Sequence, residues 1–302
     1  MEWRSTQFLI LGLGRSGRGA IDLLLRFGGQ PAGYDRTPPG AADAKQFAAW
    51  EEEGARFFYG EPDEALLNDI DIVVVSPGLT TEHTLVAAAK ERGIPVISEI
   101  ELAYRAADCP IIAVTGTNGK STTTSLIGEI MKREGRRVAV AGNIGRPLTD
   151  VVGPHRDYDL IVAEISSFQL ETIDRFRPKT AVLLNLTDDH LDRHGSFENY
   201  ASIKARLFEN QDETDAAILN YDDPAVRRIG NTLKSRVLWF SREVGGNLPG
   251  VSLTYGEIRS KMDDEEELVG LERDIAIPGP HNRMNALASV AAAKVMDVPN
   301  KV

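Results

Sequence analysis

Residues 111–125 read I-I-A-V-T-G-T-N-G-K-S-T-T-T-S, an apolar run followed by a glycine-containing turn with a lysine and several hydroxyl side chains. The apolar run predicts a buried strand, and the apolar spacing after the turn predicts an amphipathic helix. A strand, a glycine turn and a helix N-terminus together can hold nucleotide phosphates, with Lys adding a charge and Ser or Thr binding Mg²⁺. The common pattern G-x-x-x-x-G-K-[ST] has glycine where this chain has Val114, so the prediction rests on Gly119, Lys120 and Ser121 in their strand–loop–helix context.

The composition predicts a globular α/β protein of about two domains. The chain has 302 residues, of which 42% are hydrophobic and 26% charged, ordinary values for a folded chain. A net charge of −11 argues against nucleic-acid binding, and the acidic run at residues 263–267 predicts a solvated loop. A single cysteine, Cys109, excludes an internal disulfide framework and fits a reducing compartment. With no signal-peptide pattern and no uncharged run of about 18 residues, we expect a cytoplasmic protein without membrane partners. We also expect a monomer that has no nucleic-acid partner.

A second glycine-rich turn follows the first predicted strand. Residues 8–11 are apolar, residues 12–17 read G-L-G-R-S-G, and a helix and a short strand ending at Asp35 come next. G-x-G-x-x-G with an acidic residue roughly 20 positions later is the dinucleotide-binding fingerprint, so the turn taken alone predicts NAD binding. The same pattern indicates no more than a helix N-terminus that follows a strand and can bind an anion. It is therefore weak evidence for an oxidoreductase.

The rest of the first hundred residues alternates strands and helices. Residues 71–76 and 95–98 predict buried strands on either side of a helix at 82–92, a pattern typical of a doubly wound parallel sheet. Such sheets bind ligands at the carboxyl ends of their strands, which here are residues 14–17, 35–36 and 76–78. We expect a Rossmann-like domain over residues 1–107, a P-loop-type ATP-binding α/β domain over 108–298, and the start of a linker at 299–302.

Two predicted strands of the second domain end in polar side chains. A strand at residues 160–163 runs into Glu164, and a carboxylate in that place beside a phosphate loop is a good Mg²⁺ ligand, although an ordinary strand-end glutamate has the same pattern. A strand at 181–186 opens into T-D-D-H-L-D-R-H at 187–194, which could be a metal site, a general base or a solvated loop. The cluster lacks the H-E-x-x-H spacing of zinc hydrolases, so catalytic zinc is disfavoured.

Two further helices are predicted. A helix over residues 197–210 carries Lys204 near its middle, where a lysine usually faces solvent. The segment P-G-P-H-N-R-M-N at 278–285 precedes an alanine-rich helix at 286–296, and Asn282 could cap that helix or reach a ligand. From these patterns alone, neither side chain is assigned a function.

Six motifs along the chain resemble those of the Mur ligase family. They are T-G-T-N-G-K-S-T (115–122), A-G-N-I-G (141–145), E-I-S-S-F-Q-L-E (164–171), N-L-T-D-D-H-L-D-R-H (185–194), Y-A-S-I-K-A-R-L-F-E-N (200–210) and P-G-P-H-N-R-M-N-A (278–286). They occur in the family's order and cover the chain, and S-S-F-Q-L-E is typical of the D-glutamate-adding members. The resemblance implies a cytoplasmic step of peptidoglycan synthesis. In that step ATP phosphorylates the terminal carboxylate of UDP-N-acetylmuramoyl-L-alanine, and the amine of D-glutamate attacks the acyl phosphate to form an amide.

The resemblance also implies roles for individual residues. The catalytic groups would be Lys120, Glu164, His190 and Lys204. ATP would be bound by Thr115, Gly116, Thr117, Asn118, Gly119, Lys120, Ser121, Thr122 and Asn282. The UDP substrate would be bound by Arg15, Ser16, Asp35, Arg36, Gly78, Asn143, Ser166 and His190. Two Mg²⁺ ions would be held by Ser121, Glu164, His190 and Lys204, the lysine as a carbamate formed with CO₂.

Members of this family carry a third, C-terminal domain that binds the incoming amino acid. We therefore expect a further domain of roughly 100–150 residues beyond Val302, and we expect residues 1–302 not to complete amide formation by themselves. Two other hypotheses remain, an NAD-dependent oxidoreductase and a non-catalytic nucleotide-binding module. The oxidoreductase leaves Lys120 and Glu164 unexplained.

Overall fold

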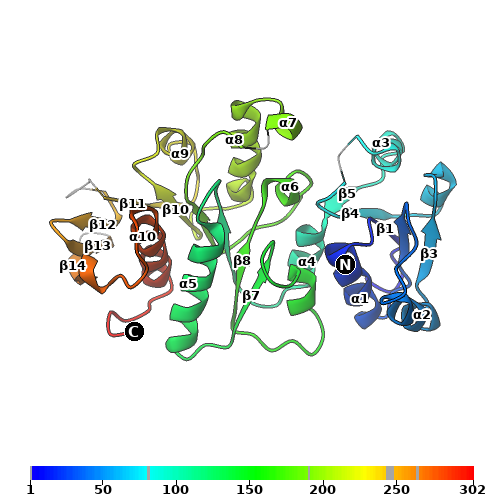
Figure 1. Cartoon of the computed structure of the whole chain (residues 1–302), viewed down its shortest axis with the longest axis horizontal. Helices are drawn as coiled ribbons and strands as arrows, with labels where there is room; N and C mark the ends of the chain where they lie inside the picture. Colours follow the sequence, from blue (N-terminus) through cyan, green and yellow to red (C-terminus); the bar gives the residue numbers. More distant parts are fainter. Residues whose placement is uncertain (1, 80–81, 190, 243–247, 263–264) are drawn as a thin grey trace. The chain divides into compact units, whose positions relative to one another are not determined.

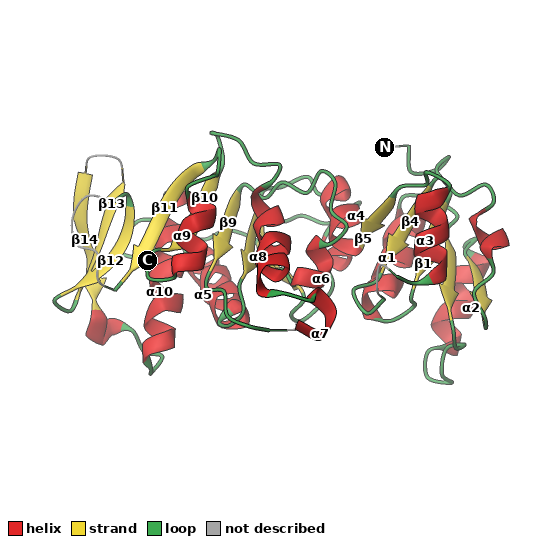
Figure 2. Ribbon diagram, turned by 90° about the horizontal axis from the view of Figure 1, so that it is seen from above, coloured by secondary structure: helices red, strands yellow, loops and turns green. Residues whose placement is uncertain are grey.

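The computed structural model describes residues 2–79, 82–189, 191–242, 248–262 and 265–302, and the chain divides into two compact units, each with its own sheet. Unit 1 comprises Met1–Asp108, Arg146–Arg156 and Phe168–Phe176, and unit 2 comprises Cys109–Gly145, Asp157–Ser167 and Arg177–Val302. Figure 2 shows the strands of each unit bordered by helices. The predicted α/β fold with parallel sheets is confirmed.

Unit 1 is built on a five-stranded parallel sheet in the order β3-β2-β1-β4-β5. Its strands are β1 (Phe8–Leu11), β2 (Ala32–Asp35), β3 (Arg56–Tyr59), β4 (Ile72–Val75) and β5 (Val96–Ser98). Its helices are α1 (Arg15–Arg26), α2 (Ala44–Glu52), α3 (Thr84–Glu91) and α4 (Glu99–Ala106), with the 3-10 turns η1 (Glu64–Leu67) and η2 (Leu148–Val151). β1 is buried along its whole length, as expected where a parallel sheet is covered on both faces, and its sequence is therefore continuously apolar.

Two stretches from later in the chain complete unit 1. Arg26, at the end of α1, donates hydrogen bonds to the carbonyl oxygens of Thr149 (2.8 Å) and Val152 (2.7 Å). Glu101 of α4 accepts the backbone N–H groups of residues 174–176 at 3.0, 3.0 and 2.8 Å. The short helix α6 (Ser167–Leu170) leads toward that segment. These bonds join backbone far apart in the sequence to the helices of unit 1.

Unit 2 is built on a nine-stranded sheet in the order β14-β13-β12-β11-β10-β9-β6-β8-β7. Its strands are β6 (Ile111–Thr115), β7 (Val138–Gly142), β8 (Leu160–Glu164), β9 (Thr180–Leu183), β10 (Ala216–Asn220), β11 (Arg236–Ser241), β12 (Gly250–Thr254), β13 (Glu257–Met262) and β14 (Glu265–Leu271). From β7 across to β12 neighbouring strands are parallel, while β13 and β14 are added antiparallel. Because β6 lies between β8 and β9, the segments that follow these three strands meet at one edge of the sheet.

The helices of unit 2 cover this sheet. They are α5 (Lys120–Arg133), α7 (Leu191–His194), α8 (Phe197–Ala205), α9 (Pro224–Gly230) and α10 (Pro280–Val295), with the 3-10 turns η3 (Arg206–Phe208) and η4 (Glu272–Asp274). α5 and α10 run side by side (Figure 1) and share one apolar core with the sheet. The many alanines of α10 let its backbone approach that core closely.

Two predicted boundaries next to the candidate site are wrong. β9 ends at Leu183 rather than at residue 186. The N–H of Leu184 still bonds to Thr115 of β6, but the carbonyl oxygen of Asn185 accepts from Thr117 in the loop after β6. α10 begins at Pro280 rather than at residue 286, since proline suits the first helical position and Gly279, with a φ of 103°, turns the chain into it. Asn282 therefore lies inside the first turn of α10 and not at its cap.

Two further predictions differ from the structure elsewhere in unit 2. The helix predicted over residues 197–210 is α-helical only as far as Ala205 and then tightens into η3. Residues 265–267, predicted as part of a solvated loop, form the start of β14, although their side chains are exposed as expected.

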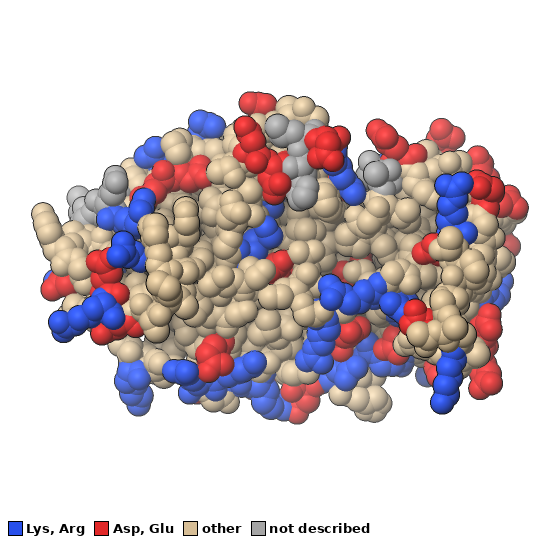
Figure 3. Space-filling view, in the orientation of Figure 1, with Lys and Arg blue, Asp and Glu red and all other residues tan. Residues whose placement is uncertain are grey.

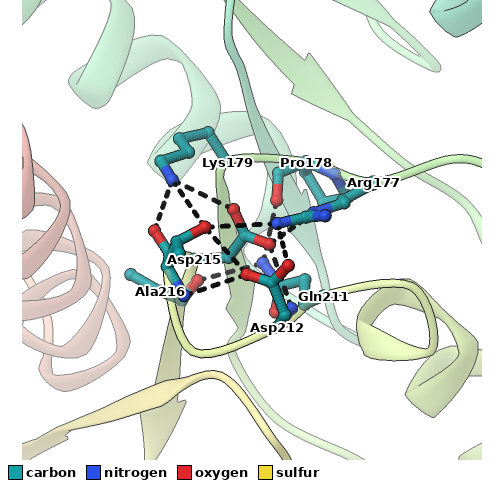
Figure 4. A network of polar contacts seen from close by, with 8 residues as sticks. Arg177, Pro178, Lys179, Gln211, Asp212, Asp215 and Ala216 are labelled. Carbon is teal, nitrogen blue, oxygen red and sulfur yellow. Dashed lines mark hydrogen bonds and ion pairs between the residues drawn. The ribbon is translucent and has the colours of Figure 1, made fainter.

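A polar network joins the amino ends of β9 and β10 (Figure 4). The buried carboxylate of Asp215 accepts hydrogen bonds from Nε of Arg177 (2.6 Å) and Nζ of Lys179 (3.2 Å). The amide nitrogen of Gln211 bridges two backbone carbonyl oxygens, one before β9 and one at the start of β10, at 2.9 and 3.2 Å. The network lies at the edge of the sheet opposite to the loop after β6, so it stabilises the sheet without contacting that loop.

No helix in the described part of the chain is both long and apolar enough to cross a bilayer. On the face shown in Figure 3, basic side chains gather around the carboxyl-terminal end of α5, where Lys132 and Arg133 occupy the last turn. Positive charge at that end of a helix interacts favourably with the helix dipole.

Candidate active site

The chain leaves β6 through a tight loop, residues 116–119, and enters α5. Gly119 has a φ of 86°, and a Cβ atom there would lie 2.3 Å from Oδ1 of Asn285, so only glycine fits. Thr123 makes the first hydrogen bond back along the helix, from its N–H to the carbonyl oxygen of Gly119 (2.9 Å). Helix geometry leaves the N–H groups of the first turn without carbonyl partners, and they present the positive end of the helix dipole to an anion.

Lys120 places its charge at the mouth of this loop. Its ammonium donates to the carbonyl oxygens of Gly116 (2.9 Å) and Thr117 (2.7 Å). Burial lowers the pKa of Lys120, and the negative charges of Glu164 and Asp189 oppose that shift. The lysine predicted to bind phosphate therefore lies beside the N–H groups that would bind the same anion.

The side chains of Ser121 and Glu164 meet beside the loop. Glu164 ends β8, is 2% exposed, and accepts a hydrogen bond from Oγ of Ser121 at 2.6 Å through Oε2. Its other oxygen, Oε1, accepts Nδ2 of Asn143 at 2.7 Å. A hydroxyl and a carboxylate within contact distance are hard oxygen donors of the kind that Mg²⁺ shares with phosphates. The residues present therefore fit a magnesium ion next to the loop.

Lys204 lies inside the protein, against the usual expectation for a lysine on a helix. It is 1% exposed, and its ammonium donates to Oγ1 of Thr115 (3.2 Å) and lies 4.9 Å from the centre of the Tyr200 ring. Burial, followed by the positive charge of Lys120, lowers the pKa of Lys204 to about 7. A neutral amine is therefore present in quantity at physiological pH, at the end of β6 next to the phosphate loop.

A pocket of about 960 Å³ opens beside the loop within unit 2. Of the residues predicted to bind ATP, its lining includes Asn118, Gly119, Thr122 and Asn282. The others, Thr115, Gly116, Thr117, Lys120 and Ser121, belong to the same strand, loop and helix start. The opposite wall comes from the ends of β10 and β11 and the first turn of α10, and the volume suits a nucleoside.

The remaining predictions in this unit have mixed outcomes. His190 lies outside the described residues. Ser166 is partly exposed two positions after Glu164. The second histidine of that motif, His194, is buried with Nε2 3.0 Å from Oγ of Ser167, so it packs internally. In the part of the chain that the structure describes, no three His, Cys, Asp or Glu side chains cluster as a metal site.

In unit 1, Asp35 is engaged with the glycine turn. Its carboxylate accepts the backbone N–H groups of Leu13 (2.7 Å) and Thr37 (3.3 Å). A Cβ atom at Gly17 would lie 1.9 Å from the carbonyl oxygen of Gly12, so this glycine is required for close packing of α1 on the turn. With both oxygens accepting from the backbone, Asp35 supports the turn itself, and the ribose contact expected of an NAD site has no observation in its favour.

The other predicted substrate residues lie at the same edge of unit 1. Arg36 is exposed and pairs with Glu61 at 2.9 Å. Gly78 faces open space, and Ser16 is partly exposed in the first turn of α1. Arg15 lines a pocket of about 400 Å³ whose walls include three more arginines, at positions 18, 146 and 156. The pocket is also lined by Asp22 and Asp150, so its four guanidinium groups outnumber its carboxylates, a balance that favours an anionic ligand.

Three residues near the site were not assigned roles from the sequence. Tyr200 is buried with its hydroxyl 3.1 Å from Oγ1 of Thr117, Asn285 abuts Gly119, and Asn185 contacts the backbone of the loop. All three fall within the quoted motifs, but their contacts depend on the packing of distant segments.

Comparison with protein families identifies both units. The MurD-like N-terminal domain of Mur ligases matches residues 6–98, and the Mur ligase middle domain matches residues 114–293. The chain belongs to the Mur ligase family. It is 44% identical over 297 residues to the UDP-N-acetylmuramoylalanine--D-glutamate ligase of Pelotomaculum thermopropionicum, covering 98% of this chain and 65% of the relative. It is 40% identical to the enzyme of the same name from Salinibacter ruber, covering 100% of this chain and 66% of the relative.

Solved structures share the fold. A Neisseria UDP-N-acetylmuramate:L-alanyl-gamma-D-glutamyl-meso-diaminopimelate ligase superposes with a TM-score of 0.62 at 22% identity, covering 98% of this chain and 95% of that chain. The Thermotoga maritima MurF ligase in complex with ADP gives 0.52 at 18% identity, covering 98% of this chain and 61% of that chain. The chain thus spans about two thirds of the length of the curated relatives. The relatives and neighbours named here are ligases by name, so they give the NAD hypothesis no support.

Proposed function

We propose that this chain supplies the nucleotide site and the UDP-substrate site of an ATP-dependent ligase that adds D-glutamate to UDP-N-acetylmuramoyl-L-alanine. Relatives named for this activity are 40–44% identical over nearly the whole chain. The reaction needs a phosphoryl group to reach the carboxylate of the UDP substrate, giving an acyl phosphate that the amine of D-glutamate can attack. A carboxylate is a poor electrophile, and two anions must first be brought together.

Positive groups around the loop would bring the two anions together. The N–H groups at the start of α5 and the ammonium of Lys120 would hold the β- and γ-phosphates and stabilise charge during transfer. The pocket beside them would hold the nucleoside, with Asn282 near the base. Asn143 keeps the carboxylate of Glu164 oriented through its 2.7 Å hydrogen bond, and we assign Asn143 and Ser166 to the muramoyl part of the substrate.

We assign magnesium to the oxygen side chains of this site. Ser121 and Glu164 would hold one ion, and Glu164, His190 and Lys204 would hold a second. When bound, Mg²⁺ neutralises phosphate charge and orients the transferred group. The burial of Lys204 and its pKa of about 7 favour the neutral amine that reacts with CO₂, and the resulting carbamate would change a cation into an anionic oxygen ligand.

We assign the UDP part of the substrate to unit 1. Arg15, Ser16, Asp35, Arg36 and Gly78 lie at the carboxyl edge of its sheet, where a ligand of such a sheet binds. Asp35 would act there through the glycine turn that it supports. The arginine-lined pocket beside Arg15 supports an anionic ligand there. A reaction that uses ATP and a UDP-linked precursor belongs in the cytoplasm, which the single cysteine also fits.

The observation that carries this proposal is the contact between Ser121 and Glu164 at the entrance of a loop that also presents Lys120. The test is a titration of the chain with ATP and Mg²⁺, followed by incubation with UDP-N-acetylmuramoyl-L-alanine and trapping of the acyl phosphate with hydroxylamine. We expect ATP binding, and a hydroxamate that forms only when ATP, Mg²⁺ and this substrate are all present. Binding of NAD but not of ATP would refute the proposal.

The choice of amino acid needs its own assay. With the full-length protein, ADP release in the presence of the UDP substrate should depend on D-glutamate. L-alanine and a diamino acid are tested in its place as alternative substrates. ADP release that depends on one of them rather than on D-glutamate would assign the chain to another member of the family.

A further inference from the structure

The segment that follows β9, residues 185–187, is bonded to the phosphate loop along its length. The carbonyl oxygen of Asn185 accepts the N–H of Thr117 at 2.9 Å. The N–H of Thr187 donates to Oγ1 of Thr117 at 3.0 Å, and the same hydroxyl lies 3.3 Å from the carbonyl oxygen of Thr187. The loop is therefore supported by a neighbouring strand end, in addition to its own turn geometry.

The side chain of Asn185 makes the most specific of these contacts. Its Oδ1 accepts the backbone N–H of Asn118 at 2.8 Å, and its Nδ2 donates to the carbonyl oxygen of Asn118 at 3.0 Å. One primary amide thus pairs with both polar groups of a single loop residue. An amide side chain offers the adjacent donor and acceptor that such pairing needs.

These contacts determine which loop N–H groups can face a phosphate. The N–H groups of Thr117 and Asn118 are both engaged by Asn185. The N–H groups at the helix start belong to residues 119–122, where helix geometry leaves the donors without carbonyl partners. The N–H groups of Thr117 and Asn118 are therefore removed from the phosphate-binding backbone assigned from the family motif.

We propose that Asn185 is a positioning residue of the nucleotide site, holding the backbone at Thr117 and Asn118 so that phosphate contacts fall to the N–H groups of residues 119–122. The inference rests on the proposed function, because the anion it concerns is the phosphate chain of ATP. Asn185 acts through the loop, since both ends of its amide are already bonded to Asn118.

The same segment connects the loop to the far wall of the pocket. The N–H of Leu186 donates to Oδ2 of Asp223 at 2.8 Å, and Oδ1 of Asp223 accepts the N–H groups of Ala225 and Val226 at the start of α9, at 2.8 and 3.2 Å. Asp223 and Asn118 both line the pocket. Residues 185–187 therefore set the phosphate loop at a fixed distance from the wall of the pocket.

The experiment is a titration of the chain with Mg-ADP, comparing wild type with Asn185→Ala. If the loop then adopts its binding geometry about a tenth of the time, the dissociation constant rises about tenfold. The matched control is Gln211→Ala, which removes an amide that also bridges two backbone groups, but at the opposite edge of the sheet. We expect a similar loss of thermal stability in both variants and an unchanged dissociation constant in Gln211→Ala.

Amide hydrogen exchange followed by NMR tests the geometry directly. In wild type we expect the amides of Thr117 and Asn118 to be protected, and the amides of residues 119–122 to shift when Mg-ADP binds. In Asn185→Ala the protection of Asn118 should be lost. In Asn185→Asp the carboxylate can still accept that N–H, so protection should return, while affinity stays below wild type because the donor to the carbonyl of Asn118 is missing.

The outcomes of these experiments distinguish the proposed function from the positioning role of Asn185. A wild-type chain that binds no Mg-ADP would overturn the proposed function together with this inference. A wild-type chain that binds Mg-ADP, with equal affinity in Asn185→Ala, would overturn the inference alone. So would an unprotected Asn118 amide in wild type, or an equal loss of affinity in Gln211→Ala.

Discussion

Glu99 and Glu101 are two buried carboxylates at the start of α4, and the structure predicts opposite effects for neutralising them. Glu99 is 1% exposed, and its oxygens accept hydrogen bonds from the N–H and hydroxyl of Thr149 (3.2 and 3.3 Å) and from the side-chain amide of Gln169 (3.4 Å). Glu101 accepts three backbone N–H groups and pairs with Nε of Arg105 at 2.7 Å. Both side chains attach α4 to segments from later in the sequence, but the Thr149 and Gln169 groups that bond to Glu99 are neutral.

The size of the stability change expected on neutralising Glu99 follows from the pKa of its carboxyl group. Burial raises the pKa of Glu99 from 4.5 to about 7, against the hydrogen bonds that lower it. An acid that is weaker in the folded state binds its proton more tightly there, so folding stability falls as the pH rises from about 4.5 to about 7 and is constant above. The difference in the proton affinity of Glu99 between the folded and unfolded states corresponds to about 3 kcal/mol of lost stability at pH 8. This uses 1.36 kcal/mol for each tenfold change in proton affinity.

We therefore expect Glu99→Gln, which resembles the protonated acid, to be more stable than wild type at pH 8 by up to about 3 kcal/mol and similar at pH 5. Glu101→Gln should lose about 2–3 kcal/mol at both values, because it removes the charge that pairs with Arg105 and places a donor against three N–H groups. Glu101→Gln is the matched control, since it makes the same chemical change two residues away on the same helix.

The assay is urea unfolding at pH 5, 6, 7 and 8, with tryptophan fluorescence as the probe. Trp3 and Trp50 belong to unit 1 and Trp239 to unit 2, so a Trp239→Phe background makes the signal report on unit 1 alone. This matters because two units need not unfold together. A stability difference between Glu99→Gln and its parent that does not change with pH would refute the reasoning.

Four further predictions test other parts of the structure. Glu164→Gln keeps the shape of the side chain but loses its charge, so titration should show at least a tenfold smaller effect of Mg²⁺ on ADP affinity. Lys204→Arg cannot form a carbamate, so full-length protein should lose ligase activity, and a short carboxylate should partly restore activity to Lys204→Ala but not to Lys204→Arg. Gly17→Ala would place a Cβ atom 1.9 Å from the Gly12 carbonyl oxygen and should destabilise unit 1 by about 3 kcal/mol in urea unfolding, with Mg-ADP binding by unit 2 retained. Asp215→Ala leaves Arg177 and Lys179 without their shared carboxylate and should cost about 3 kcal/mol of stability with no change in ADP affinity while the protein is folded.

The sequence was sufficient for the parts of the site that follow local rules. Lys120 and Ser121 were predicted from a strand, a glycine turn and a helix start, and the structure has this order of elements. Glu164 was predicted as a candidate from its place at the end of an apolar strand, and the pairing of β6 with β8 brings it to Ser121. Both predictions depend on the general rule that parallel strands end at one edge of the sheet.

Other features could not be predicted because they arise from long-range packing. The pattern of α8 gives no sign that Lys204 is buried, since its contact with Thr115 joins residues 89 positions apart. The early end of β9 accompanies hydrogen bonds between Asn185 and the loop after β6, in which Asn185 accepts from the N–H groups of Thr117 and Asn118. The inclusion of residues 146–156 and 168–176 in unit 1 depends on Arg26 and on the carboxylates of α4, which no periodicity reveals.

The charges near the loop explain why these distant contacts matter for the proposed chemistry. Lys120 and Lys204 each have a pKa lowered by burial, and the charge of Lys120 lowers that of Lys204 further, so the two ammonium groups disfavour one another. The negative charges of Asp189 and Glu164 act against both shifts. A carbamate on Lys204 would replace the repulsion by attraction and would keep Lys120 protonated for phosphate binding. The contact of Lys204 on α8 with Thr115 at the end of β6 would then link the charge state of Lys120 to a modification on another element.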